Sequence, residues 1–451
     1  MKSAREIISD CRARRYSAGT LQYSAFGVIS VSFWLLWGAF WYEIIEYVLV
    51  PTLLPLQYKS FGASGTLMGV MLGSVPALLN FVVNPIISTA SDATRSKYGR
   101  RIPYLAASIP FLASLCIMIG WIPEISEWVA GFSGADKLTV GLALLCVVSA
   151  LFYFCSLFIG AIGCYLPPDV IPSCFIGRYM VAARLVSSAA GFLFNYFLMK
   201  YATSHSKEIF TGLGLAFALC YTVMVLKVKE GEYPPPPKPE GTPAQRLGTQ
   251  IKGYFTECFC NRFYLILFLG IAITQVSTQC RGIFNILFAT KDLALTTEQY
   301  GQINAVGSLA VLAATFLCFF WIDKVNPLLV FIASNIPILI LNVYGYYGVH
   351  DYSSFYIVGV LIVIAYSVQN LSFVPMLIKL LPKEKFGQYS SANAMMCCIL
   401  RVVTSYFCGL AVDRFGNRFI YVWDFVFTVF AALILLESYR LTRRQEPAAV
   451  D

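Results

Sequence analysis

Long apolar runs recur along almost the whole of this 451-residue chain. A helix needs about 20 mostly apolar residues to cross about 30 Å of hydrocarbon. Lipid cannot satisfy backbone polar groups, so such a run must be a helix or part of a closed barrel, whose strands alternate in polarity over about 10 residues. These runs are longer than barrel strands and do not alternate. The sequence therefore predicts an all-α membrane protein.

The expected spans form two sets of six, giving about twelve transmembrane helices. The first set falls at about residues 26–56, 64–90, 102–122, 138–166, 175–200 and 208–227. The second set falls at about residues 262–290, 298–321, 327–347, 354–378, 388–412 and 418–438. Composition agrees, because 58% of the residues are hydrophobic and 13% are charged, whereas soluble domains carry about 25% charged residues.

A proline-rich stretch near the middle of the chain marks a domain boundary. Pro234 begins a run of prolines, and Pro239 follows shortly after it. Such a polar, proline-rich segment cannot form a packed core. We therefore expect an N-terminal six-helix bundle over residues 1–227, a cytoplasmic linker over 228–255 and a C-terminal six-helix bundle over 256–451.

The two halves also resemble each other locally. The same spacing of proline, glycine and tyrosine opens the fifth and the eleventh expected spans, at Pro172, Gly177 and Tyr179 and at Pro382, Gly387 and Tyr389. Chance similarity is the alternative, and the matched position within each half argues against it. Because internal repeats are a signature of transporter folds, we expect two pseudo-symmetric bundles.

Positive charge lies mainly in short loops between the apolar runs, as it does in loops that stay in the cytoplasm. With the N-terminus inside, most of the 33 Lys and Arg residues fall on the cytoplasmic side. We therefore expect both termini in the cytoplasm of an inner or plasma membrane, with no nucleic acid as partner. Residues 1–22 are polar and basic, and the following apolar run is too long for a signal-peptide core, so no cleavable signal is expected.

Residues that would hold a metal or a cofactor are scarce. Most of the 14 cysteines fall in apolar segments, where cysteine behaves as a small buried hydrophobe. The histidines are His205 and His350, and no zinc-type spacing follows Cys258 and Cys260. No nucleotide-phosphate motif is present. We expect no metal, no cofactor and no catalytic residue, which disfavours an enzyme or an ATP-driven pump.

The loop between the second and third expected spans carries the most specific motif. It reads Ser91-Asp92-Ala93-Thr94-Arg95-Ser96-Lys97-Tyr98-Gly99-Arg100-Arg101-Ile102-Pro103. Glycine allows a tight turn without strain, and arginine binds carboxylates with two parallel hydrogen bonds. A basic cytoplasmic loop is the plainer interpretation, but the full pattern is more specific than that.

This loop resembles the signature loop of the major facilitator superfamily. Its Arg-Ser-x-x-Gly-Arg-Arg-x-Pro form is similar to that of the glycoside–pentoside–hexuronide cation symporters and the sucrose-type transporters. The resemblance implies alternating access and a sugar or glycoside substrate. It also implies a cytoplasmic gate, which we assign to Asp92, Arg95, Gly99, Arg100 and Arg101, with a weaker counterpart at Asp323 and Lys324 in the second half.

Two carboxylates in the first expected span are candidates for ion coupling. Glu43 and Glu46 are three residues apart and so share one helix face. An ionisable residue within a span is by default a functional hypothesis. The alternative is that both lie near a water-filled mouth and only tune topology. Melibiose-type relatives carry acidic residues in span two, where this chain has Asn80 and Asn84, so we expect protons rather than sodium as the coupling ion.

Polar residues in other spans are candidates for binding the substrate. Span seven carries a polar wall, which either lines an aqueous cavity or joins helices structurally. Amide, hydroxyl and guanidinium groups suit a hydroxylated solute. The full set of candidate substrate-binding residues is Asn80, Asn84, Gln275, Thr278, Gln279, Arg281, Asn285, Gln302, Gln369 and Asn370.

Arginines within spans need counter-charges. We expect Arg184 and Arg401 to be buried charge partners, and Glu43 and Glu46 to be the carboxylates that pair with Arg281 or Arg401. Asp424 lies early in span twelve, which more often faces outward, so it is a weaker candidate.

The residues and the resemblance together predict a monomeric secondary transporter of a small polar solute, a sugar or glycoside, coupled to protons. A facilitator or exporter of a non-sugar metabolite or drug is the alternative within the same fold. A membrane-bound enzyme or a sensor is the alternative from another class, and neither a reactive constellation nor a soluble output domain supports it.

Overall fold

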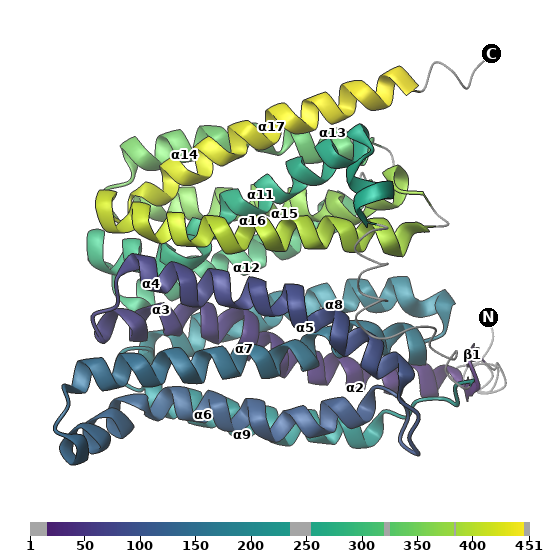
Figure 1. Ribbon diagram of the computed structural model, residues 1–451, viewed down its shortest axis with the longest axis horizontal. Helices are drawn as coiled ribbons and strands as arrows, with labels where there is room; N and C mark the ends of the chain where they lie inside the picture. Colours follow the sequence, from purple (N-terminus) through teal and green to yellow (C-terminus); the bar gives the residue numbers. More distant parts are fainter. Residues whose placement is uncertain (1–15, 235–253, 320–324, 383–384, 446–451) are drawn as a thin grey trace, which may run out of the picture. The chain divides into compact units, whose positions relative to one another are not determined.

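The computed structural model describes residues 16–234, 254–319, 325–382 and 385–445 (Figure 1). Twelve helices in these ranges are long and apolar enough to span a membrane. They run over Ala25–Ser60, Gly65–Ala93, Ile102–Ser133, Lys137–Val170, Ser173–Tyr201, Ser206–Lys227, Arg262–Asp292, Thr297–Cys318, Pro327–Gly348, Tyr352–Leu380, Phe386–Phe415 and Phe419–Arg443. The predicted all-α membrane architecture is confirmed, and each expected span overlaps one of these helices, although the third helix extends well beyond its expected end.

Several spans of the first half are composed of more than one helical segment. The segments, in chain order, are α2 (Ala25–Glu43), η1 (Ile44–Leu49), α3 (Val50–Ser60), α4 (Gly65–Gly69), η2 (Val70–Ser74), α5 (Val75–Ala93), α6 (Ile102–Ser133), α7 (Lys137–Val170), α8 (Ser173–Leu193), η3 (Phe194–Leu198), η4 (Met199–Tyr201) and α9 (Ser206–Lys227). Segments η1, η2 and η3 are π-helical. Such insertions bulge the helix and are frequent at functional sites.

The second half also contains spans that are composed of more than one helical segment. Its segments are η5 (Tyr254–Phe259), α11 (Arg262–Leu287), η6 (Phe288–Asp292), α12 (Thr297–Phe319), α13 (Pro327–Ala333), α14 (Asn335–Gly348), α15 (Tyr352–Leu380), α16 (Phe386–Phe415) and α17 (Phe419–Gln445). Within this half, α11 packs against α16 and α17, and α12 packs against α15.

Local sequence explains where helices begin and end. Ser24 caps α2 by accepting a hydrogen bond from the Gly27 amide, and Asp351 forms a capping box at the start of α15. Helix α6 continues past residue 122, where its apolar run was expected to end. It stops at Gly134, whose φ of 66° is the left-handed conformation that glycine adopts readily. The polar final turns of α6 therefore extend the helix beyond its apolar part.

A small β-hairpin precedes the first span. Strand β1 (Tyr16–Ala18) pairs with β2 (Leu21–Tyr23) in antiparallel register, and Gly19 turns the chain with a φ of 58°. The Thr20 hydroxyl at the turn accepts a hydrogen bond from the Glu232 amide at 2.8 Å. This contact attaches the hairpin to the segment that follows α9.

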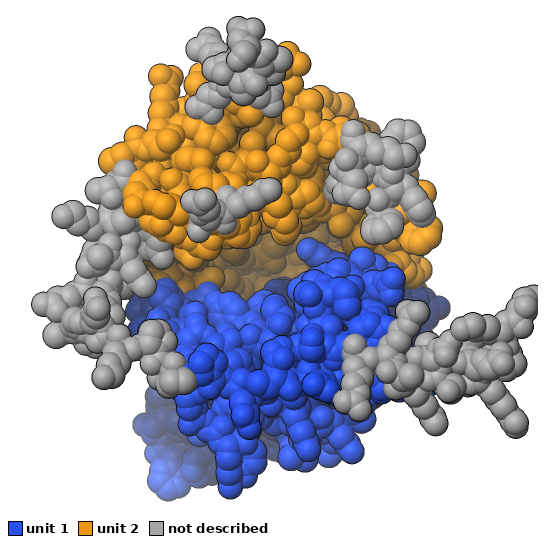
Figure 2. All heavy atoms as spheres, turned by 90° about the vertical axis from the view of Figure 1, so that its right-hand side faces the viewer, with its two compact units in different colours: residues 1–54, 82–237 blue, residues 55–81, 238–451 orange. Residues whose placement is uncertain are grey.

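Contacts divide the chain into two compact units (Figure 2). The first contains residues 1–54 and 82–237, and the second contains residues 55–81 and 238–451. The bundle boundaries expected from the sequence would assign residues 55–81 to the first half. They group with the second because α4 and η2 pack on α16. Residues 235–253 of the expected linker lie outside the described residues.

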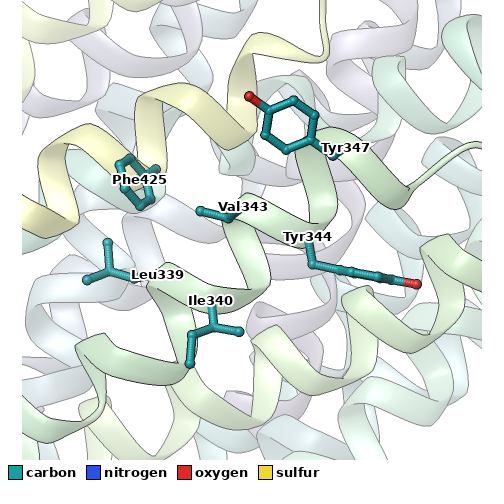
Figure 3. Close-up of a pocket in the computed structure, with 6 residues that line it drawn as sticks. All are labelled: Leu339, Ile340, Val343, Tyr344, Tyr347 and Phe425. Atoms are coloured by element: carbon teal, nitrogen blue, oxygen red, sulfur yellow. The ribbon is translucent and has the colours of Figure 1, made fainter.

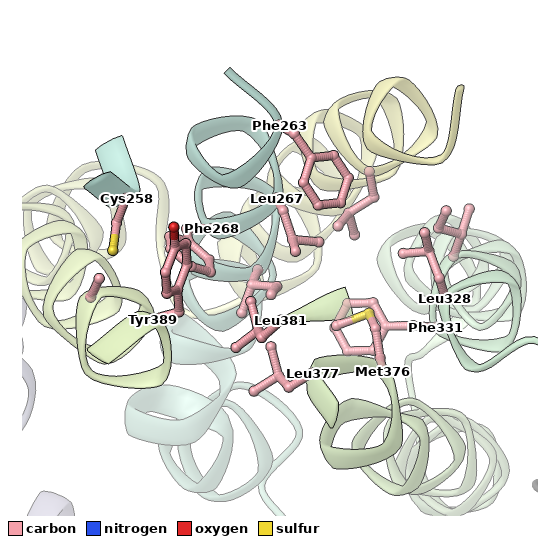
Figure 4. Packing of buried hydrophobic residues seen from close by; sticks show 14 residues of the cluster. Cys258, Phe263, Leu267, Phe268, Leu328, Phe331, Met376, Leu377, Leu381 and Tyr389 are labelled. Atoms are coloured by element: carbon pink, nitrogen blue, oxygen red, sulfur yellow. The ribbon is translucent and has the colours of Figure 1, made fainter. Parts of the chain in front are cut away.

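Buried apolar side chains hold one end of the second unit together (Figure 4). Phe263, Leu267 and Phe268 of α11 meet Phe331 of α13 and Met376 of α15 in this cluster. Lipid tails are as apolar as these side chains, so close van der Waals packing is what holds the helices together here. The cluster fixes α11, which carries half of the candidate substrate-binding residues.

An apolar groove of about 540 Å³ lies between α14 and α17 (Figure 3). Leu339, Ile340, Val343, Tyr344, Tyr347 and Phe425 line it. The lining offers almost no polar group, and a polar solute would lose its hydrogen bonds to water there. The groove is therefore unsuited to a polar solute.

Candidate functional site

The loop between α5 and α6 makes a tight turn at its glycine. Gly99 has a φ of 109°, and an added Cβ would lie 2.6 Å from the side chain of Glu230. The Ser96 hydroxyl donates to the Gly99 carbonyl at 2.7 Å and accepts from the Tyr98 amide at 3.1 Å. Only glycine combines this backbone conformation with such a close neighbour.

The two arginines after this turn share a pair of carboxylates. Arg100 donates to both oxygens of Asp169, with Nη2 distances of 2.8 and 2.9 Å, and Arg101 Nε donates to Asp169 at 3.2 Å. Arg101 Nη2 also lies 2.8 Å from Asp92, and Arg100 Nη1 lies 3.5 Å from it. Asp92 is about half exposed and Asp169 is mostly buried. The network therefore ties the ends of α5 and α7 to the start of α6.

Glu230, which follows α9, caps the first turn of α6. Its carboxylate accepts backbone N–H bonds from Arg100 at 3.0 Å, Arg101 at 2.8 Å and Ile102 at 2.7 Å. The first amides of a helix lack partners within the helix and carry partial positive charge, so a carboxylate there is favourable. The Tyr233 hydroxyl donates to the same carboxylate at 3.0 Å.

Electrostatics favour one protonation state for two members of this network, Arg100 and Tyr233. Burial lowers the pKa of Arg100, but the hydrogen bonds and charge of Asp169, with Tyr233 and Asp92, raise it above its ordinary value. Burial and then the Glu230 carboxylate raise the pKa of Tyr233. Tyr233 therefore stays a neutral donor, and its ring lies 4.1 Å from the Arg100 guanidinium carbon.

Arg95 lies at the edge of the same network. Its Nε donates to the Pro234 carbonyl at 2.8 Å, and its Nη1 donates to the Asp92 carbonyl at 2.6 Å. The structure thus brings together every residue assigned to the gate in the first half. The counterpart proposed at Asp323 and Lys324 lies outside the described residues.

Asp169 and Glu230 are central to this network and are not predicted from the sequence. Asp169 ends span four after Pro167 and Pro168, and comparing acids with arginines at the same membrane face could have found it. Glu230 is 130 residues from Arg100 in sequence and sits in the expected linker. No local pattern signals that it folds back onto the loop.

Glu43 and Glu46 flank the point where α2 becomes the π-helical segment η1. Glu46 lies beside Ser156 of α7, and its Oε2 is buried without a hydrogen-bond partner among the described residues. The Tyr42 hydroxyl donates to the Ser156 carbonyl at 3.1 Å. The bulge thus places a carboxylate oxygen inside the first unit with no fixed donor.

Arg184 of α8 is the positive charge that acts on Glu43. Its side chain is exposed, and so is that of Arg401 in α16. The expectation that these two arginines are buried is therefore wrong for this structure. An exposed arginine inside a span needs water or a polar neighbour, because hydrocarbon offers neither.

Arg281 pairs with Asp424, which lies in the same unit. Its Nη2 lies 3.4 Å from Asp424 Oδ2, and the same nitrogen donates to Asn342 Oδ1 at 2.6 Å. Asp424 is 0% exposed, so the expectation that it faces outward is also wrong. Asp424 points inward because α17 packs along α11 within this unit.

Some polar residues of the predicted substrate set join helices instead of facing open space. Gln279 donates to the Ser405 hydroxyl and the Arg401 carbonyl of α16, and it accepts from Thr404 at 3.2 Å. Gln369 is buried and donates to Asn335 Oδ1 at 3.1 Å. Gln279 thus acts as an interhelical contact, which is the structural alternative for the polar wall of span seven, and Gln369 of α15 joins helices in the same way.

Other members of the set remain accessible. Gln302 and Asn370 are exposed although they lie within spans, and Gln275 and Thr278 are half-buried on α11. Asn285 donates to the Tyr300 hydroxyl at 3.5 Å.

The two span-two asparagines contact different helices. Asn80 lies 3.7 Å from Cys398 Sγ of α16. Asn84 accepts from the Tyr165 hydroxyl of α7 at 3.5 Å. These long contacts leave both amides capable of exchanging partners.

The sequence profile of the Major Facilitator Superfamily matches residues 25–399 and, in a second match, residues 267–450. Human solute carrier family 45 member 3 is 29% identical over 245 residues, which cover 51% of this chain and 41% of that protein. The mouse protein of the same name is 28% identical over 206 residues, which cover 42% of this chain and 35% of that protein. The matched region thus spans about two fifths of the length of these relatives.

Solved structures share the same architecture. A crystal structure of the nucleoside transporter NupG gives a TM-score of 0.67 at 12% identity, covering 91% of this chain and 100% of that chain. A crystal structure of a D-xylose–proton symporter gives a TM-score of 0.66 at 15% identity, covering 90% of this chain and 97% of that chain. At these identities the likeness concerns the fold.

Proposed function

Because this chain belongs to the Major Facilitator Superfamily, we propose that it moves a sugar or glycoside across the membrane by alternating access, driven by protons. A multi-pass secondary transporter of a small molecule is the premise that the family supplies. The substrate class and the coupling ion are the proposed part. Both rest on the polar groups within the spans.

The proposal of proton coupling is supported mainly by the buried carboxylate of Glu46. Its Oε2 has no hydrogen-bond partner among the described residues, and Glu43 is one helical turn away. A charge held within a span is expensive, so a carboxyl there gains from binding a proton. Arg184 acts on Glu43, which leaves Glu46 as the favoured carrier of the proton.

A sugar or glycoside fits the accessible polar residues. Gln302 and Asn370 offer amides, and Thr278 offers a hydroxyl, so they supply both donors and acceptors. Hydroxylated solutes need that mixture. The form of the loop at residues 95–103, which resembles that of the glycoside–pentoside–hexuronide symporters, supports the same substrate class. The solved D-xylose–proton symporter is an example of such a function on this fold.

The loop network of Asp92, Arg100, Arg101, Asp169 and Glu230 is proposed to work on the cytoplasmic side. The loop at residues 94–101 carries Arg95, Lys97, Arg100 and Arg101, and basic residues in a short loop agree with retention in the cytoplasm. Its carboxylates hold the guanidinium groups at the ends of three helices. We expect it to keep those ends together as a rigid block while the protein changes conformation.

Uptake by reconstituted protein tests this function. Proteoliposomes are given a panel of labelled mono- and disaccharides with an inward proton gradient, a sodium gradient or no gradient. Proton-driven accumulation of a sugar is expected. Equilibration without accumulation would indicate a facilitator, and outward movement would indicate an exporter. Absence of sugar transport under every gradient would reject the sugar assignment.

A further inference from the structure

A buried cluster in the second unit combines a carboxylate and a guanidinium from different helices. Arg281 of α11 and Asp424 of α17 form an ion pair at 3.4 Å, and the exposed fractions of their side chains are 10% and 0%. Asp424 Oδ2 accepts from the Tyr366 hydroxyl of α15, and Oδ1 accepts from Thr428 at 3.2 Å. Asn342 of α14 completes the cluster by accepting from Arg281.

Other groups that can carry charge face this cluster. The Tyr421 ring of α17 lies 4.8 Å from the Arg281 guanidinium carbon. The Cys280 thiol of α11 interacts with Asp424 and with the Cys408 thiol of α16. Arg281 is the cation that balances the Asp424 charge in this set.

The ion pair is poorly matched in geometry. A guanidinium can bind a carboxylate with two parallel hydrogen bonds, but Arg281 makes a single long contact to Asp424. Its shorter bond is to Asn342, at 2.6 Å. Arg281 Nε is buried without a hydrogen-bond partner among the described residues. The guanidinium therefore retains a donor that another acceptor could satisfy.

Removing Arg281 from this pair would leave a charged carboxylate in the interior. An uncompensated buried charge costs several kcal/mol, and such a group binds a proton instead. Arginine only donates hydrogen bonds, so the group that draws it away must offer acceptor oxygens. Sugar hydroxyls and carboxylates have such oxygens.

We propose that Asp424 is a second proton-binding carboxylate of this transporter, and that Arg281 is the counter-charge whose displacement by a substrate oxygen lets the proton bind. The proposal rests on the proton-coupled transport proposed above. The only bonds that change are those to the proton, which passes from a hydronium ion to Asp424 Oδ2 and leaves a water molecule. The Tyr366 hydroxyl then no longer donates to this oxygen. Glu46 in the first unit and Asp424 in the second would then each carry a proton.

Infrared spectroscopy of the protein in lipid tests the titration without any substrate. Relative to the wild type, Arg281→Gln at neutral pH is expected to show an additional C=O stretch of a protonated carboxyl. The double variant Arg281→Gln/Asp424→Asn should lack this additional band, while any band from Glu46 is common to all the proteins compared. Glu437→Gln is the matched control, because Glu437 lies on the same helix, faces Arg440 at 3.5 Å and is more exposed. An Arg281→Gln spectrum without the additional band, or an additional band that persists in the double variant, would overturn the proposal.

The double variant also provides a test if Arg281→Gln does not fold. Removing both charges is less disruptive than removing one. Wild-type protein and the double variant are then acidified stepwise. The other carboxyls titrate in both proteins, so the two series are subtracted. A carboxyl band that remains in the difference, gained by the wild type alone, is expected, and identical spectra would reject Asp424 as a proton site.

Transport gives an independent readout. With a solute found in the uptake panel, Asp424→Asn is expected to halve the number of protons moved per solute molecule while exchange of solute without a gradient continues. An unchanged ratio would overturn the proposal. If no sugar is transported, the infrared result still decides the role of Asp424, so the two proposals fail separately.

Discussion

At the residue scale, the loop between α5 and α6 depends on one carboxylate and one glycine. Glu230 accepts from the backbone amides of Arg100, Arg101 and Ile102, and Gly99 leaves room for the Glu230 side chain. The motif itself is evident in the sequence, because its residues are contiguous. Its partners come from α7 and from the segment after α9, and only the fold brings them there.

Replacing Glu230 with alanine should loosen the start of α6. Hydrogen bonds to a charged group contribute about 1.5–3 kcal/mol each, and they are not additive, so we expect a loss of about 2–3 kcal/mol of stability. Hydrogen exchange at residues 99–105 and the thermal unfolding of the purified protein measure this. Glu232→Ala is the control, because the contact of Glu232 to Thr20 uses its backbone amide. Equal exchange in both variants would contradict the capping role.

Replacing Gly99 with alanine should disturb the same loop for a different reason. Alanine resists a φ of 109°, and its Cβ would lie 2.6 Å from Glu230. Strain of this kind costs about 1–3 kcal/mol, so the melting temperature should fall. Gly212→Ala in α9 is the control, because nothing lies within 4 Å of the added Cβ there. A Gly99→Ala protein as stable as the control would show that the loop readily adopts another conformation.

At the scale of elements, the positions of the spans in the sequence are predictable, but the side that each helix buries is not. Apolar length locates all twelve helices, because crossing a bilayer requires it. Helices that are apolar on all sides give little indication of which face is buried, so the inward position of Asp424 could not be foreseen. The π-helical segment at Glu46 also leaves no clear mark in the sequence, because it depends on how η1 packs against its neighbours.

The contact of α4 with α16 gives the element-scale prediction. Asp413 of α16 accepts from the Gly65 and Thr66 amides, which caps α4. An added Cβ at Gly69 would overlap the Ser405 carbonyl oxygen. Gly69→Ala should therefore separate the two helices and lower stability by about 1–3 kcal/mol, as overpacking does. Thermal unfolding measures this.

Gly177→Ala is the matched control for Gly69→Ala, since nothing lies within 4 Å of its added Cβ. The two variants should differ clearly in melting temperature. Similar values would mean that α4 and α16 are not in close contact in the membrane.

At the scale of the whole molecule, the division into two six-helix halves follows from the linker and from the repeated spacing at residues 172–179 and 382–389. Contacts nevertheless group residues 55–81 with the second half. Sequence order alone could not predict this, because it depends on small residues that let α4 and η2 approach α16. The spans and their order can therefore be predicted from the sequence, whereas the helices that each span contacts depend on packing.

The membrane orientation is testable at this scale. An epitope inserted after Gly134, between α6 and α7, should be accessible to antibody on intact cells. An epitope at the C-terminus should become accessible only after permeabilisation. The reverse result would place the loop at residues 94–101 outside the cell and remove the proposed cytoplasmic gate.

The most direct test of proton-coupled transport is proton entry on addition of a transported sugar to proteoliposomes, followed with a pH-sensitive dye trapped inside. Wild-type protein and Glu127→Gln, which alters an exposed carboxylate paired with Lys137 at 2.7 Å, should acidify the lumen equally. Glu46→Gln should reduce the protons moved per sugar by at least half, because the buried carboxylate that binds them is lost. Sugar entry without acidification in the wild type, or an unchanged ratio in Glu46→Gln, would contradict the account.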